Sequence, residues 1–191
     1  MKSVFKYIFA LLSLVSVVSA CNNNSSSHKQ YEEADLYGAW ECNLNDSITS
    51  GKEIICFFPE KRFEVTDSLA LINEEDGFRV NLSFVVHIQG SWSFNPADNM
   101  ISVKYDSSSL NVTPDFETFS LEATGENADI SAMESIKNEM AQELAGDLIK
   151  IYTDQYLAIA DQEISLGAVL EADHKRLSLA SNNGRLDLVR K

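Results

Sequence analysis

The chain of 191 residues carries a formal net charge of −14, and 45% of its residues are hydrophobic. Such acidity argues against a nucleic-acid partner and against binding to an anionic bilayer surface, because like charges repel. The three cysteines and three histidines form no spacing typical of a metal site, so we expect neither a metal nor a cofactor. The length suffices for one domain with a sizeable core.

The N-terminus has the order of a secretory signal peptide. Lys2 and Lys6 precede or flank an apolar run at residues 8–18, which is too short for a comfortable membrane span. The run ends in the sequence VSAC at residues 18–21, which resembles a bacterial lipobox. That resemblance implies cleavage before Cys21, acylation of this residue and stable anchoring to a membrane by more than one acyl chain.

The next residues predict a flexible tether, because residues 22–34 are polar and have no apolar period. We therefore divide the chain into a signal peptide at 1–20, a tether at 21–34 and one domain at 35–191. Cleavage would remove two lysines and no acidic residue, and would change the formal charge from −14 to −16. By the usual sorting pattern of lipoproteins, Asn22 favours the outer membrane. No acidic run follows the cysteine, which favours the periplasmic side over the cell surface.

The clearest strand signal lies at residues 78–95, where apolar and polar residues alternate almost without fault. A straight strand of this length would span about 55–60 Å, which is long for a small domain. We therefore expect a bend, with Gly90 as its natural place. A bent long strand is characteristic of a sheet that curls on itself.

Shorter strands are predicted on both sides of this one, separated by short polar turns, of which Asn183-Gly184 is the strongest hairpin signal. The pattern predicts a mainly β protein, an antiparallel meander that closes into a barrel of about 8–10 strands. The ranges are 36–44, 53–58, 62–72, 100–105, 117–123, 164–172, 176–180 and 185–189.

One long amphipathic helix is predicted at residues 129–153, before the last strands, with Asp129 as its N-cap. The helix could pack on the sheet or close one barrel end, or it could form a lid or a partner-binding face. If it packs on the sheet, its buried residues should be Met133, Ile136, Met140, Leu144 and Leu148.

Alternation places Cys42 and Cys56 on the apolar faces of two consecutive strands. The two residues lie opposite each other if the connecting turn centres near residues 48–50, and a disulfide is then feasible with some strain. The alternative is two buried free thiols that act as small apolar side chains.

Gly38 and Trp40 form a Gly-x-Trp motif on the first predicted strand, and Gly90 and Trp92 repeat the spacing later. The first motif resembles the signature of the lipocalins. Together with the lipobox and the series of strands, it makes the chain resemble the lipocalin-like lipoproteins of Bacteroidetes.

The resemblance implies a lipocalin-like barrel with Trp40 packed across its closed end and an arginine against the tryptophan, for which Arg185 and Arg190 are candidates. It also implies a small hydrophobic ligand, such as a lipid. Protein partners are not indicated by any motif.

The sequence holds none of the common catalytic motifs, and we expect no enzymatic activity. Asp67 stands out, because alternation places it on the apolar face of its strand, where a carboxylate needs partners and could contact a ligand. The alternative is a bulge that turns it outward. The tripeptides at residues 46–48 and 67–69 resemble a short O-glycosylation sequon.

Two functions remain open at this point. The first is an anchored binding protein that holds a small hydrophobic molecule inside its barrel. The second is a structural or interaction subunit of an envelope complex. In that case the large inward side chains would fill the barrel. Whether the interior is open or packed separates the two.

Overall fold

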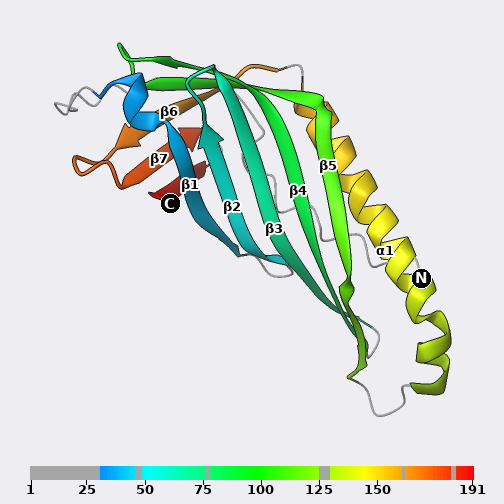
Figure 1. Ribbon diagram of the computed structural model, residues 1–191. Helices are drawn as coiled ribbons and strands as arrows, with labels where there is room; N and C mark the ends of the chain where they lie inside the picture. Colours follow the sequence, from blue (N-terminus) through cyan, green and yellow to red (C-terminus); the bar gives the residue numbers. More distant parts are fainter. Residues whose placement is uncertain (1–30, 46–48, 76–77, 125–129, 161, 182–183) are drawn as a thin grey trace.

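The computed structural model describes residues 31–45, 49–75, 78–124, 130–160, 162–181 and 184–191. Eight antiparallel strands follow one another in chain order around a closed barrel, and one helix is inserted between the fifth and the sixth (Figure 1). The mainly β prediction is therefore confirmed. The elements are β1 (Gly38–Asn45), β2 (Thr49–Phe57), β3 (Arg62–Glu75), β4 (Phe78–Asn95), β5 (Met100–Ala123), α1 (Ile130–Ile159), β6 (Ile164–Leu170), β7 (Arg176–Ser181) and β8 (Gly184–Arg190).

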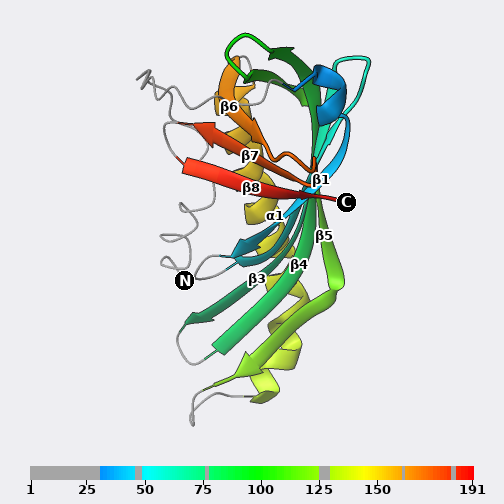
Figure 2. The same cartoon turned by 90° about the vertical axis from the view of Figure 1, so that its left-hand side faces the viewer.

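The strands differ greatly in length, and this sets the shape. β3, β4 and β5 extend well beyond the shorter strands, and α1 runs along this extension beside β5 (Figures 1 and 2). The barrel closes by a short pairing between β1 and β8, at Trp40 with Arg190 and Glu41 with Val189. The interior is therefore bounded by all eight strands at one end and by a helix-covered sheet at the other.

The period-two pattern of β4 was predicted correctly, and its inward side chains form much of the core. Leu82, Phe84, Val86, Ile88 and Trp92 are all buried. β4 continues through Gly90 as one strand. A Cβ atom at Gly90 would lie 2.2 Å from the carbonyl oxygen of Lys104 and 2.4 Å from the ring of Phe63. This glycine therefore permits close packing between neighbouring strands.

β5 joins two predicted strands into one of 24 residues, because it carries two insertions relative to β4. At the first insertion, the backbone N–H of Ser108 donates to the Asp106 carboxylate at 3.0 Å. The N–H of Gln89 on β4 donates to the hydroxyl of Ser109 at 2.8 Å. Side chains thus satisfy backbone groups that the irregular register would leave unpaired.

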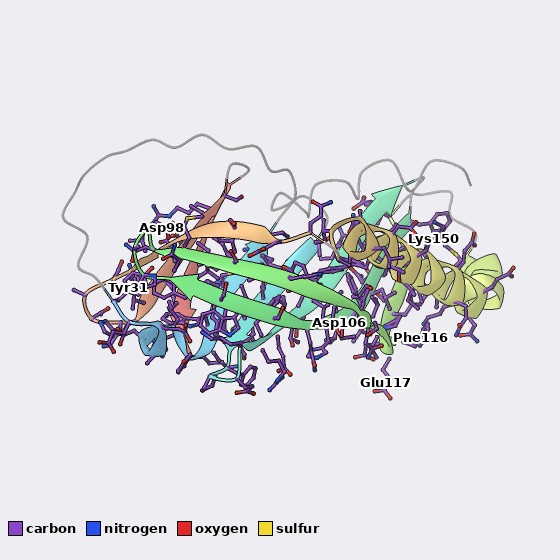
Figure 3. The ribbon with its side chains drawn as sticks, turned by 90° about the horizontal axis from the view of Figure 1, so that it is seen from above. Tyr31, Asp98, Asp106, Phe116, Glu117 and Lys150 are labelled. Carbon is purple, nitrogen blue, oxygen red and sulfur yellow. The ribbon has the colours of Figure 1, made fainter. Side chains whose placement is uncertain are left out.

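The second insertion repeats this arrangement. The N–H of Glu117 donates to the Asp115 carboxylate at 3.1 Å, and the N–H of Ser83 donates to the hydroxyl of Thr118 at 2.8 Å. Figure 3 labels Asp106 at the first insertion and Phe116 and Glu117 at the second, with Glu117 pointing away from the ribbon. The insertions keep the long strand continuous while its register shifts.

Helix α1 is longer than predicted and uses a different face. It ends at Ile159 rather than near Thr153. Leu148 is buried as expected, whereas Met140 and Leu144 lie half-buried at the edge of the packed face. Met133 and Ile136 are not among the residues whose side chains the structure describes, so their predicted burial stays a prediction. The buried stripe consists of Ala141, Ala145, Leu148, Tyr152, Tyr156 and Ile159.

The helix packs on the inner side of the sheet through its tyrosines. The ring centroids of Tyr152 and Phe84 lie 5.4 Å apart, and those of Tyr156 and Tyr105 lie 5.5 Å apart. The predicted face was rotated by about one residue because the prediction followed the largest aliphatic side chains. Alanines at Ala141 and Ala145 let the helix approach the strands instead.

The predicted disulfide is wrong, because the register of β1 and β2 separates the two cysteines. Cys42 pairs with Glu53, and Cys56 pairs with Ala39. Both are free thiols; Cys42 is buried on the inner face and Cys56 lies on the outer face. The continuous apolar run at residues 54–58 carries no alternation, so its inward side could not be chosen from the pattern.

The folded domain begins before residue 35, which corrects the predicted end of the tether. Tyr31 is buried, donates a hydrogen bond to the carbonyl of Ala168 at 2.7 Å and stacks on Phe94. A 3-10 helix, Glu33–Leu36, follows directly and leads into β1.

Candidate functional site

The barrel encloses a cavity of about 160 Å³. Its walls come from β1, β2, β3 and β5–β8, and the C-terminal half of α1 closes it through Tyr152, Tyr156 and Ile159. Most of the lining is apolar, with Ile55, Leu69 and Leu179 as examples. A cavity of this size is comparable to one that holds a benzene-sized molecule. The interior of the barrel thus keeps an unfilled space beside the helix.

One wall of the cavity carries two carboxyl groups. Glu53 on β2 and Asp67 on β3 are direct cross-strand partners, and both line the cavity. Glu53 also pairs with Cys42 of β1, whose Sγ lies 3.9 Å from Glu53 Oε1. The three side chains therefore form a transverse row on the inner face of the sheet.

The two carboxyl groups interact with each other, and both have raised pKa values. Asp67 is only 6% exposed, and burial, together with the negative charge of Glu53, raises the pKa of Asp67 well above its ordinary value. Burial also raises the pKa of Glu53, to about 7. The two carboxyl groups lie close enough that each affects the pKa of the other, and burial is the largest cause of both increases.

One oxygen of this pair is left without a partner. Asp67 Oδ1 is buried and accepts no hydrogen bond from any residue that the structure describes. An unpaired buried polar atom costs free energy, about 1–3 kcal/mol, and native structures contain few of them. The atom therefore marks a place where a donor from outside the chain would fit.

Aromatic rings face the same space. Tyr105 of β5 and Tyr156 of α1 meet edge to face, and Phe63 packs on Tyr105 with ring centroids 5.3 Å apart. Burial raises the pKa of Tyr105 and of Tyr156, and the charges of Glu53 and Asp67 raise both further. The phenols therefore stay neutral at physiological pH and lie close enough to the carboxyl pair to sense its charge.

The cavity wall offers these carboxyl groups no close cation. Among the described residues that line it, the only basic one is Arg185. Its side chain is 64% exposed, and it donates to Asp187 and Ser178 at 2.7 Å each. The carboxyl pair consequently lacks a positive partner on the protein side.

The structure places Asp67 where alternation predicted it, on the inner face, and the alternative of an outward bulge is wrong. Glu53 was missed, because the apolar run after it hid which side of β2 faces inward. Once Ile55 and Phe57 are known to be buried, Glu53 can be assigned to the inner face, because strand residues two apart share a face. Tyr156 was missed because the predicted helix ended too early.

The Gly-x-Trp motif lies near the start of β1, and neither Gly38 nor Trp40 lines the cavity. Trp40 is fully buried and donates to the carbonyl of Leu36 at 2.8 Å. Of the two candidate arginines, Arg190 stacks on it, 4.2 Å from the ring centroid, and also donates to the carbonyls of Tyr37 and His174. Gly38 has a φ of 111°, which favours glycine.

The second pair of motif residues has a packing role. Trp92 is buried, packs on Phe57 with centroids 4.8 Å apart and donates to the carbonyl of Phe58 at 3.1 Å. Gly90 provides the close approach described above. Neither residue lines the cavity.

Cys21 and the sequon-like tripeptide at residues 46–48 lie outside the described residues, so their predictions remain predictions. Ser68 of the other tripeptide is exposed on β3. The chain matches no model of a known protein family and no curated protein.

The described parts of the chain hold neither a cluster of metal ligands nor a helix suited to cross a membrane. No three His, Cys, Asp or Glu side chains gather there in a way that could hold a metal ion. α1 and the other helical segments there do not combine the length and the apolar character that a membrane crossing requires.

Proposed function

We propose that this protein is a membrane-anchored, non-enzymatic binding protein that holds one small molecule with an apolar body inside its barrel. The observation that carries the proposal is the cavity of about 160 Å³ with a buried, unpartnered carboxyl oxygen in its wall. A mostly apolar concave space with a few converging polar groups is the usual form of a small-molecule site.

The filled-barrel alternative is less well supported. Large buried side chains that do not line the cavity, such as Trp40, Phe84 and Trp92, do fill part of the barrel. A space of about 160 Å³ nevertheless stays unfilled among mostly apolar side chains, which forgoes the packing contacts that a filled core would make. A purely structural barrel would gain stability by filling this space, whereas a binding protein needs it open.

The lipocalin-like assignment and the anchor complete the proposal. Gly38, Trp40 and Arg190 meet near the start of β1, with the arginine against the tryptophan as the resemblance implies. Acylation at Cys21 would hold the barrel at the outer membrane, on its periplasmic side. The residues before Tyr31 would then connect the anchor to the folded domain.

Binding of toluene tests the cavity, because this probe has the size of the space and no polar group. Isothermal titration should detect toluene binding to the wild-type protein and a loss of at least about ten-fold in a Val65→Phe/Leu179→Phe variant, whose new rings fill the cavity. Val169→Phe adds the same ring on the outer surface and should bind toluene as the wild type does. Equal binding by the filled variant, or no binding by the wild type, would contradict the proposal.

The anchor has its own test. Cys21→Ala should release the protein from the membrane fraction into the soluble fraction of the cells that make it. A variant that still partitions into detergent with the membranes would overturn the lipobox assignment.

A further inference from the structure

We infer that Glu53 and Asp67 form the polar end of the cavity and bind the protonated amine of a ligand whose apolar body lies against the aliphatic part of the wall. This inference rests on the proposed function, because it assigns a chemical class to the molecule that the cavity would hold. It excludes ligands that would place a carboxylate or a phosphate at this end.

Geometry provides the first argument. Asp67 lines the cavity, only 6% of its surface is exposed, and its buried Oδ1 has no hydrogen-bond partner among the described residues. Glu53 sits directly across the strand pair and supplies further acceptor oxygens beside it. An ammonium group has three donors, so one amine could serve both carboxyl groups.

Charge provides the second argument. The titratable groups that face the pair are Cys42 from β1, Tyr105 from β5 and Tyr152 and Tyr156 from α1, and none of these is a cation. Arg185 lines the cavity from β8 but is largely exposed and bonded to Asp187. A buried carboxylate without a counter-charge is costly, and a bound cation would relieve that cost. An anionic ligand would instead meet like charge.

The aromatic wall fits the same class of ligand. The rings of Tyr105 and Tyr156 lie near the carboxyl pair, and ring faces attract ammonium groups within about 6 Å. The remaining wall is aliphatic, including Ile55 and Leu179, and would cover the apolar body. A neutral alcohol could satisfy Asp67 Oδ1 as well, but it offers one donor and no charge.

Amine binding should depend on pH in a definite direction. The pair binds a cation best when it has lost a proton, and burial has moved its titration toward neutral pH. An aliphatic amine stays protonated throughout this range, because its pKa is near that of lysine. Its affinity should therefore rise by at least about three-fold from pH 5.5 to pH 8, whereas that of an uncharged probe should not change.

Three probes of nearly equal size test the inference: benzylamine, benzyl alcohol and toluene. At pH 7.5, wild-type protein should bind benzylamine at least about ten-fold more tightly than benzyl alcohol or toluene, as charge-assisted hydrogen bonds predict. Asp67→Asn and Glu53→Gln should each remove most of this preference while toluene still binds. Glu60→Gln, which changes an exposed glutamate, should keep the full preference.

The outcomes separate the two proposals. Toluene binding without a preference for benzylamine would overturn the amine assignment and leave the binding cavity in place. A preference for benzyl alcohol would assign a neutral donor instead. If none of the three probes binds, both proposals fail. If one of the two variants, Asp67→Asn or Glu53→Gln, does not fold, the other alone still tests the amine assignment.

Discussion

The carboxyl pair leads to a prediction about stability, because Glu53 is half-buried in the cavity wall and its folded-state pKa is raised from 4.5 to about 7. Between pH 4.5 and about pH 7, Glu53 keeps a proton in the folded state that it has lost in the unfolded state. The contribution to stability is therefore fully present below about pH 4.5 and is lost as the pH rises through 7. Asp67 shifts in the same direction and adds to the effect.

The magnitude follows from linkage. At about 1.4 kcal/mol per pH unit of separation, the difference between 4.5 and about 7 corresponds to about 3–4 kcal/mol, most of it lost between pH 5 and pH 8. Urea unfolding followed by tryptophan fluorescence over this range should show that fall in the wild type. The fall should be smaller by this amount in Glu53→Gln, which cannot titrate.

Other acidic groups also make stability pH-dependent, so the difference between the two proteins is the quantity to measure. Glu60→Gln changes an exposed glutamate and should follow the wild type. If the curves for wild type and Glu53→Gln run parallel within about 0.5 kcal/mol, Glu53 is solvated, and the buried carboxyl pair described here is wrong.

Three other predictions test the packing. Leu148→Ala should lower the free energy of unfolding by about 2–5 kcal/mol, because Leu148 is buried on α1. Leu157 is exposed on the same helix, and Leu157→Ala should change this free energy by less than about 0.5 kcal/mol. Equal effects of the two substitutions would contradict the assignment of the buried face of α1. Gly90→Ala should cost about 1–3 kcal/mol by overpacking, and a neutral result in the same unfolding assay would show that the strands can separate there. Cys42 and Cys56 should both react with a thiol-alkylating reagent after denaturation without reductant, and mass spectrometry that finds them bridged would contradict the register of β1 and β2.

The sequence was informative wherever apolar and polar residues alternate. β4 reads in only one way, because each of its inward positions from Leu82 to Trp92 is apolar or glycine. β2 could not be read in this way, since residues 54–58 are all apolar and fit either face. The wrong choice there produced both the disulfide prediction and the omission of Glu53.

The helix and β5 were predicted less fully for different physical reasons. The buried face of α1 depends on small residues such as Ala141 and Ala145 that allow close approach, and these give a weak signal in a hydrophobic pattern. The continuity of β5 depends on hydroxyl groups that accept backbone hydrogen bonds across its insertions, as Ser109 does. Such bonds depend on register, which only the folded chain defines.

The candidate site was therefore only partly predictable. Asp67 was identified because a lone carboxylate interrupts an apolar face between Val65 and Leu69. Its partner Glu53 was placed on the wrong face of its strand, and Tyr156 lies beyond the predicted end of the helix, whereas the alternation at residues 100–105 placed Tyr105 on the apolar face. The cavity itself is a property of three-dimensional packing and has no signature in the sequence.

Native mass spectrometry of the full chain, purified in mild conditions from the cells that make it, tests the binding proposal most directly. The wild-type protein should carry one small molecule per chain, and its released mass should correspond to a compound with a basic nitrogen. The Val65→Phe/Leu179→Phe variant should be detected without a bound small molecule. A wild-type protein that carries nothing, or a filled variant that retains the same molecule, would contradict a ligand site inside this barrel.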